Sequence, residues 1–196
     1  MANLNASFGL IPWGPILHTS RYAIVTEYAT AVFVGDPMGM TGASYATRFG
    51  QGIPGCEIQV AGAAGAMLGG VIAVEDYTGH PLLYLPASTA GDGVVAGYVT
   101  VADHPMQEWV IQEDGDTTPV AAASVGLNAD LIATNAGSTV TGRSGIEIDS
   151  DSVNVTATLA VHILRAHPFD TIASANCRFI CQIKAHYLGA NVVGIS

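Results

Sequence analysis

The clearest pattern of hydrophobic and polar positions lies near the end of the chain, in CRFICQIKAHYL at residues 177–188. Its odd positions are Cys177, Phe179, Cys181, Ile183, Ala185 and Tyr187. Its even positions include Arg178, Gln182, Lys184 and His186. A period of two indicates a β-strand, because successive side chains point to opposite faces of a sheet. The segment therefore predicts one buried face and one face in water.

The same alternation recurs upstream. In TATLAVHIL, the odd positions Leu159, Val161 and Ile163 are expected to point inward, which places His162 on the outer face. SGIEID at residues 144–149 repeats the pattern, with its two isoleucines expected inside and its two acidic residues outside.

Similar short runs recur along the whole chain, bounded by Gly, Pro, Asp, Asn and Ser, as is typical of strands and turns. They are YAIVT, AVFVGD, CEIQV, MLGGVIAVEDY, GVVAGYVTVA, EWVIQ, SGIEID, VNVTATLAVHILR and CRFICQIKAHYL. The run at 93–102 is apolar on both faces, which predicts a central strand covered on both sides or a strand at an interface. Only residues 118–133 are alanine-rich, and Gly126 limits any helix there to a turn or two. We therefore predict an all-β fold, an antiparallel β-barrel or β-sandwich.

The first twenty residues are different, because they are apolar and carry no charged side chain before Arg21. Their glycines and prolines interrupt any regular helix. A secretory signal would need a basic start and an unbroken apolar core, and this segment has neither. We predict an extended N-terminal arm over residues 1–20, followed by a single β-rich domain over residues 21–196.

Seven large apolar side chains lie on this arm: Leu4, Phe8, Leu10, Ile11, Trp13, Ile16 and Leu17. Their burial would yield roughly 10–20 kcal/mol, whereas ordering about twenty backbones costs roughly 20–40 kcal/mol. The arm therefore needs a docking surface, either on the chain's own body or on another subunit. We favour another subunit, with Phe8 and Trp13 as anchors, because large aromatic side chains dominate interface energies.

Composition also favours assembly. Hydrophobic residues make up 49% of the 196 residues and charged residues only 11%, against about 25% charged in ordinary domains. Part of the surface is therefore expected to be covered by other subunits. The net charge of −10 argues against binding to nucleic acid or to an anionic membrane, since both require basic side chains. The most apolar window, residues 58–74, contains Gln59 and four glycines and is too short to span a bilayer.

The cysteines and histidines do not form a metal-binding motif. Strand alternation places Cys177 and Cys181 on the face opposite His186, and Cys56 alternates with Glu57. All three thiols are therefore expected to be small core hydrophobes. The acidic run at 113–116 is expected to be a solvated turn, and it lacks the alternating oxygen ligands of an EF-hand loop.

Two further motifs also fail as catalytic or cofactor sites. GAAGAMLGG at 62–70 is followed by another strand, whereas a dinucleotide site needs a helix after the glycine turn. GRSG at 142–145 is not the G-x-S-x-G nucleophile motif, and no histidine and carboxylate complete a triad around Ser144. We expect no enzymatic activity and no cofactor.

Several stretches follow one another along nearly the whole chain: MAN and FGLIP near the start, YATAVFVGDPM at 28–38, YLPASTA at 84–90, GLNAD at 126–130, TGRSGIEIDSD at 141–151 and LAVHILR at 159–165. Together they resemble a family of small tailed-phage virion proteins, the head decoration or cement proteins. Leu85 departs from the resemblance, because relatives carry an aromatic residue before Pro-Ala. The resemblance implies a β-rich body, a β-tulip or β-barrel, that sits outside the capsid and bridges major capsid subunits, commonly as trimers. It implies no catalytic residues.

We therefore expect a structural protein of the virion, on the outer capsid surface and assembled in the cytoplasm of the bacterial host. Its expected partners are the major capsid protein and further copies of itself in a homotrimer. The alternative is a virion-attached binding module for a receptor or a glycan, which would need exposed aromatic side chains around a shallow polar pocket. Trp109 is the candidate for that role, although its strand neighbour Ile111 favours a place in the core.

Overall fold

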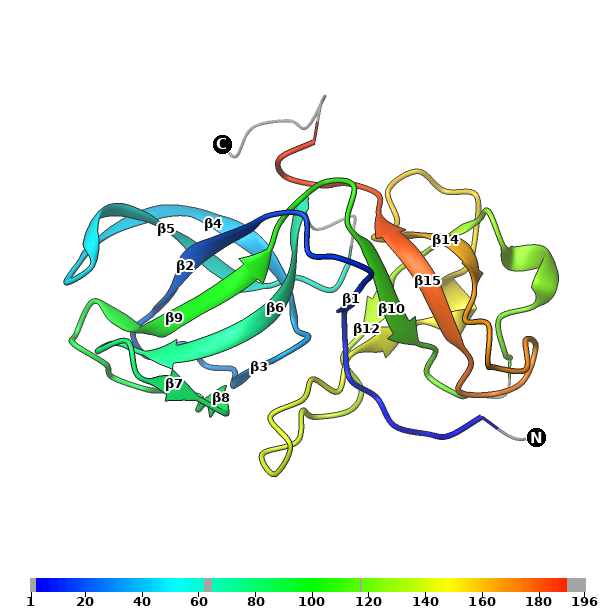
Figure 1. The fold of residues 1–196 in the computed structure, drawn as a ribbon, viewed down its shortest axis with the longest axis horizontal. Coiled ribbons are helices and arrows are strands. Elements are labelled where there is room, and N and C mark those ends of the chain that lie inside the picture. Colours follow the sequence, from blue (N-terminus) through cyan, green and yellow to red (C-terminus); the bar gives the residue numbers. More distant parts are fainter. Residues whose placement is uncertain (1–2, 62–64, 117, 190–196) are drawn as a thin grey trace.

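The computed structural model describes residues 3–61, 65–116 and 118–189, which form short strands joined by turns (Figure 1). The strands are β1 (Ile11–Trp13), β2 (Thr19–Val25), β3 (Val32–Phe33), β4 (Pro37–Thr47), β5 (Gly50–Ile58), β6 (Met67–Asp76), β7 (Pro81–Leu82), β8 (Tyr84–Leu85), β9 (Val95–Ala102), β10 (Glu108–Gln112), β11 (Asn128–Ala129), β12 (Leu131–Ile132), β13 (Glu147–Ile148), β14 (Val161–Ala166) and β15 (Arg178–Ile183). Two single 3-10 turns are η2 (Ala122–Ser124) and η3 (Ser150–Ser152). The predicted all-β fold is confirmed, and the only helical turn in the alanine-rich segment 118–133 is η2.

One lobe of the molecule is a small barrel, at the left in Figure 1. Its strands pair in the order β4–β5–β2–β9–β6, and β4 pairs again with β6, which closes the ring. All these pairs are antiparallel except β2 with β5, which meet at Ala23 and Gly55. β7 extends the sheet beyond β6. Closure removes the free edges that an open sheet of these strands would expose.

Strand β9 is the central strand of this lobe, because it pairs with both β2 and β6. Every residue from Val95 to Ala102 is buried except Thr100, which is half-buried. Tyr98 belongs to a small apolar cluster that Tyr45 of β4 and Ile53 of β5 cover. The prediction of a central strand covered on both faces is therefore confirmed.

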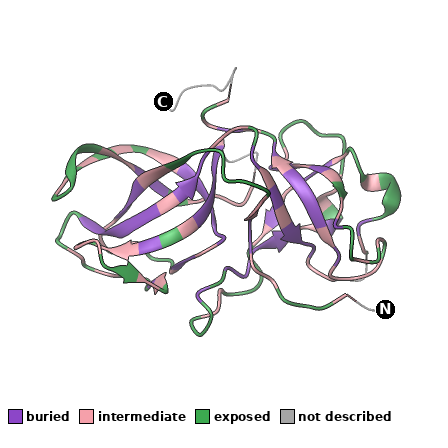
Figure 2. Ribbon diagram, in the orientation of Figure 1, coloured by how far each residue is buried: buried purple, intermediate pink, exposed green. Residues whose placement is uncertain are grey.

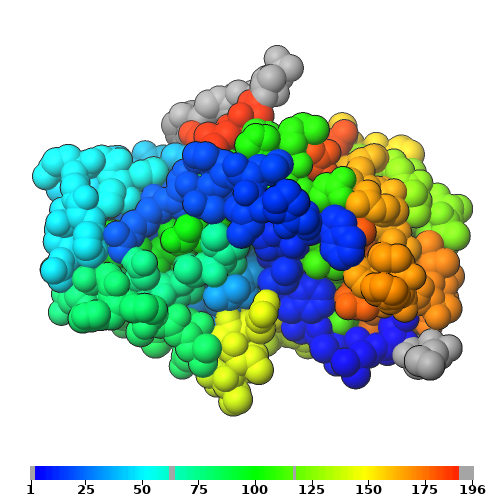
Figure 3. Space-filling model, viewed as in Figure 1, coloured from blue at the N-terminus to red at the C-terminus, as the bar shows by residue number. Residues whose placement is uncertain are grey.

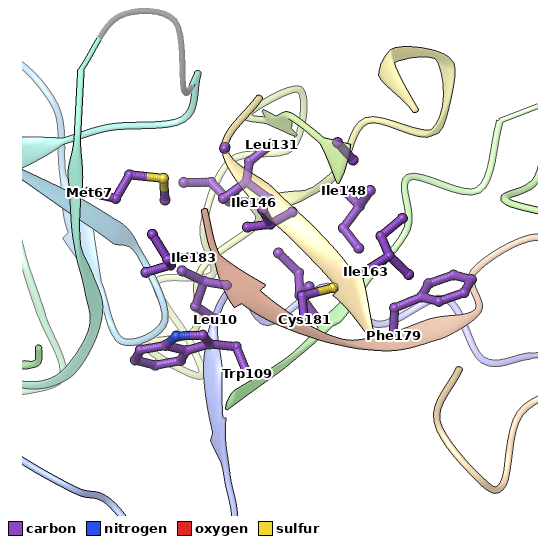
Figure 4. Packing of buried hydrophobic residues seen from close by; sticks show 14 of the residues in the cluster. Leu10, Met67, Trp109, Leu131, Ile146, Ile148, Ile163, Phe179, Cys181 and Ile183 are labelled. Carbon is purple, nitrogen blue, oxygen red and sulfur yellow. The ribbon is translucent and has the colours of Figure 1, made fainter. Parts of the chain in front are cut away.

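The second lobe is an open five-stranded sheet in the order β1–β10–β15–β14–β11, and all its pairs are antiparallel. Its buried face forms a hydrophobic core with the β12–β13 hairpin (Figure 4). Cys181 lies at the centre of the sheet, between Trp109 on β10 and Ile163 on β14. The predicted inward positions are confirmed for Phe179, Cys181 and Ile183 on β15 and for Cys177 directly before it, because all four are buried.

The two lobes share apolar contacts where they meet. Met67 comes from the barrel strand β6 but belongs to the core of the second lobe. Ile58 at the end of β5 packs against the cores of both lobes. Figure 2 shows buried residues concentrated on the strands of both lobes and exposed residues at the hairpin tips and loops. The junction between the lobes is therefore a packed interior rather than a linker.

Candidate interaction surface

The N-terminal segment lies along the surface of its own chain, dark blue in Figure 3. The Asn3 side-chain amide donates to the carbonyl oxygen of Thr171 (3.0 Å), and the backbone amide of Ala6 donates to Oε1 of Gln112 (3.1 Å). Strand β1 then pairs with β10 at the edge of the second lobe. These contacts correct our expectation that the arm packs mainly on a neighbouring subunit, because residues 3–13 dock on the chain's own body.

Leu10 is the anchor of this docked segment and is completely buried. Its amide donates to the carbonyl oxygen of Gly35 (2.7 Å), and its side chain packs in the same core as Met67 and Trp109 (Figure 4). A Cβ on Gly70 would lie 2.7 Å from the carbonyl oxygen of Leu10, so only glycine allows this approach. Leu10 is thus a core residue of its own chain and not a contact to a neighbour.

The turn before Leu10 is held by two glycines in left-handed conformations, Gly9 (φ +70°) and Gly35 (φ +97°). A Cβ on either glycine would collide with backbone atoms of the facing segment. Ser144 completes this contact, since its amide donates to the carbonyl oxygen of Val34 (2.9 Å). Three stretches that are distant in sequence, FGLIP, FVGDPM and TGRSG, therefore meet at the junction of the lobes.

Trp13 lies on the outer face of the second lobe. It pairs with Glu108 on β10, and residues that lie directly opposite one another share a face of the sheet. The Trp13 ring meets the His167 ring edge-on at 5.3 Å between centroids, and His167 lies 5.6 Å from the Phe169 ring. Phe169 itself is 87% exposed. The predicted anchor Trp13 therefore binds its own sheet and leaves Phe169 uncovered beside it.

The connector between β1 and β2 exposes the next apolar side chains, Ile16 and Leu17. The Leu17 amide donates to Oε1 of Gln107 (3.2 Å), and Nε2 of Gln107 donates to the carbonyl oxygen of Trp13 (3.4 Å). Met106, the residue before Gln107, is 65% exposed. Gln107 thus holds the connector against the β9–β10 loop, which carries the exposed Met106.

We call this set the arm surface: Trp13, Ile16, Leu17, Met106 and Phe169. It contains three of the seven arm residues predicted for an interface. The other four lie elsewhere. Phe8 and Ile11 are half-buried against the body, Leu10 is buried, and Leu4 is exposed near the start of the segment.

A buried carboxylate fixes the end of the connector. Asp103 lies 2.6 Å from Nδ1 of His18 and accepts a hydrogen bond from the Tyr22 hydroxyl (2.8 Å). Burial would raise the pKa of Asp103, but hydrogen bonds from Ser20, His18 and Tyr22 outweigh it and hold that pKa below its usual value. Asp103 is therefore ionised at neutral pH, and its contact with His18 holds the connector against the barrel.

The three cysteines are buried and carry no disulfide. Burial raises the pKa of Cys177 to about 12 and also raises the pKa values of Cys56 and Cys181. They are protonated and unreactive at neutral pH, so their predicted place in the core is confirmed. Within the described residues, no three or more His, Cys, Asp or Glu side chains are grouped to hold a metal ion.

His186 is buried, although the alternation had placed it in water. Strand β15 ends at Ile183, so the period of two does not extend to residue 186. Nδ1 of His186 accepts the Leu188 amide (3.0 Å), and burial lowers the pKa of this histidine.

Trp109 is also buried, so the aromatic side chain considered for a receptor or glycan site is not on the surface.

Two acidic residues that we expected in water are buried, Glu113 and Glu147. Glu113 accepts the amides of Val120 (2.7 Å) and Cys177 (3.3 Å), and Glu147 accepts the side-chain amide of Asn135 (2.7 Å). Burial raises the pKa of both carboxyls. Glu113 thus takes the place of a missing backbone acceptor, and Glu147 holds the loop that contains Asn135. The local sequence pattern carries no signal for either role.

The chain has no significant match among models of known families, curated proteins or solved structures. In the described part of the chain, no helix is long and apolar enough to cross a bilayer.

Proposed function

We propose that this protein is a decoration or cement protein, which binds the outer surface of a tailed-phage capsid and stabilises contacts between major capsid subunits. The arm surface is the observation that supports this proposal most directly. It exposes Ile16, Leu17, Met106 and Phe169 on segments that the hydrogen bonds of Gln107 and the ring contacts of His167 bring together. Apolar side chains gathered in this way favour a protein partner.

Charge supports the same role. Only 11% of the residues are charged, and their net charge is −10. A shell protein needs apolar flanks that other proteins cover and an outward side that keeps the particle soluble. A specific contact buries about 800 Å² on each partner, and several copies around one symmetry axis would add their contacts through avidity. The proposed partners are accordingly the major capsid protein and two further copies of this chain.

The test uses capsids of the source phage that were assembled without this protein. We expect the purified full-length protein to co-sediment with them in a saturable way and to raise the temperature at which the capsids break. The proposal fails if the protein stays in the supernatant at about 10 μM, well above the dissociation constants of stable interfaces. It also fails if the protein binds without changing capsid stability, since a cement function requires that change.

A further inference from the structure

A pocket of about 390 Å³ opens at the junction of the two lobes, away from the residues of the arm surface. It lies between β3, the end of β5 and the segment that joins β12 to β13. Its walls are almost entirely apolar and include Ala31, Phe33, Ile58, Ala133 and Ile146. Pockets of this size and character, placed between lobes, commonly bind small molecules or single side chains.

Asp36 is the one residue with an ionisable side chain among those that line this pocket, and it is only 3% exposed. Its Oδ2 accepts the Phe33 amide (2.8 Å), and the Ser144 side chain also hydrogen-bonds to the carboxyl. A carboxylate has about four acceptor positions, so Asp36 keeps capacity for a further donor. Backbone hydrogen bonds from Gly35 N to the Val71 oxygen (2.8 Å) and from Val71 N to the Asp36 oxygen (3.0 Å) fix its position.

The segment between β12 and β13, which forms the other wall of the pocket, is also held in place. A Cβ on Gly137 would collide with the Phe33 ring, so the loop packs directly on that ring. Phe33 in turn stacks on Tyr84 at 5.0 Å between centroids. The side chain of Asn135 donates to Glu147 (2.7 Å), which holds the loop to β13. The pocket is therefore built into the fold rather than formed between mobile side chains.

Among the described residues, no cationic side chain lies in an ion pair with the carboxyl of Asp36. Burial raises the pKa of Asp36 to about 6, so the carboxylate form predominates at pH 7.5 in apolar surroundings. The titratable groups on the elements around Asp36 are Tyr28, whose hydroxyl accepts the Ile58 amide, Glu147, which holds Asn135, and Arg143, whose backbone bridges Val34. Arg143 is exposed and forms no ion pair with Asp36, and the other two are not cations. The net charge of −10 further favours a cation.

We propose that this pocket binds a primary alkylammonium group, with its methylene chain against the apolar walls and its ammonium on the carboxylate of Asp36. A lysine side chain has this chemistry, because its long apolar stem ends in a compact charge with three donors. A free aliphatic amine has it too. The site does not depend on the capsid function, and the isolated protein suffices to test it.

The experiment is a ¹H–¹⁵N NMR titration of the full-length protein at pH 7.5 with n-butylammonium, and 1-butanol is the matched uncharged probe. We expect n-butylammonium to shift the amides of Ala31, Ala133 and Ala136 in a saturable way, and 1-butanol to bind at least tenfold more weakly. At pH 5 about nine in ten Asp36 carboxyls are protonated, so the affinity for n-butylammonium should fall about tenfold. Nα-acetyl-lysine methylamide tests whether the natural alkylammonium group comes from a protein or from a small molecule. If this lysine analogue binds, the ligand is a lysine of a partner protein. If only n-butylammonium binds, the ligand is a small amine.

Two variants complete the test. D36N retains a hydrogen-bond acceptor for Phe33 and Ser144 but removes the charge, so both probes should then bind equally. A136L keeps Asp36 but fills the pocket, so neither probe should bind, and a melting curve of each variant checks its fold. Equal affinity of the wild-type protein for the two probes would overturn the proposal, as would an affinity for n-butylammonium that is the same at pH 5 and pH 7.5. Absence of saturable shifts with either probe would overturn it as well, and these three results need no variant.

Discussion

At the residue scale, the most unusual feature of this protein is the number of its buried carboxyl groups. Glu113, Glu147 and Asp36 are each at most 3% exposed, although acidic side chains are rarely buried without a partner. Each accepts at least one hydrogen bond from a backbone or side-chain amide. These carboxyls therefore act as structural acceptors where no backbone carbonyl is available.

Glu113 gives the sharpest test of that role. The variant E113A would leave the amides of Val120 and Cys177 buried without an acceptor, and each such group costs about 1–3 kcal/mol. We expect the free energy of unfolding, measured by urea titration, to fall by about 2–6 kcal/mol. The exposed residue Glu57 provides the control, because E57A should change stability by less than about 0.5 kcal/mol. Equal effects of the two variants would contradict the structural role of Glu113.

The pH dependence of stability follows from Asp36. Its folded pKa, about 6, lies above the ordinary value of 3.8, so the folded state binds this proton more readily than the unfolded state. Its contribution is therefore complete below about pH 3.8 and is lost as the pH rises through 6. The full effect is on the order of 3 kcal/mol.

We accordingly expect the Asp36 contribution to the free energy of unfolding to increase as the pH falls from 7.5 to 4.5. Subtracting the D36N curve from the wild-type curve isolates this contribution, because other carboxyls titrate in both proteins. Urea titrations at several pH values provide both curves. A difference between the curves that does not change with pH would show that Asp36 titrates normally.

At the element scale, the packing of Leu10, directly before β1, tests whether the N-terminal segment belongs to the core of its own chain. L10A should lower the free energy of unfolding by about 2–5 kcal/mol, because Leu10 is completely buried beside Trp109. L4A removes the same side chain at an exposed position, so it should change stability by less than about 0.5 kcal/mol. Urea titration measures both. If L10A were as mild as L4A, Leu10 would not belong to the core of its own chain in solution.

The sequence predicts correctly which side chains are buried where the strands are long and regular. The odd positions of β15 are buried as expected, because a strand of six residues imposes a period of two on its side chains. The same rule fails at Glu147, since β13 has only two residues, and at His186, which lies beyond the end of β15. The barrel or sandwich class was therefore predictable, whereas the two lobes and their junction were not.

The place of the arm could not be decided from sequence for a different reason. Apolar residues interrupted by glycine and proline require a docking surface, but nothing local identifies whose surface it is. Leu10 docks because two glycines distant in sequence leave room for the segment: Gly35 for the backbone of Phe8 and Gly70 for the backbone of Leu10. The pocket at Asp36 depends likewise on segments about one hundred residues apart, so no local pattern indicated it.

At the scale of the whole molecule, the arm surface connects the fold to the proposed function. It combines exposed apolar residues of the connector, the β9–β10 loop and the loop after β14 on a charge-poor protein. Because Trp13 pairs with β10 and Leu10 is buried in the core, this surface is part of the folded body. A preorganised surface loses less conformational entropy on binding than a free arm would.

The most direct test of the central claim compares capsid binding by two variants in the same co-sedimentation assay. The triple variant L17S/M106S/F169S removes apolar side chains from the arm surface, and V155S removes an equally exposed apolar side chain outside it. We predict that the triple variant binds the capsid at least tenfold more weakly than the wild type, about 1.4 kcal/mol. V155S should bind as the wild type does, and both variants should keep the wild-type melting temperature within a few degrees. Wild-type affinity of the triple variant for the capsid would contradict the account.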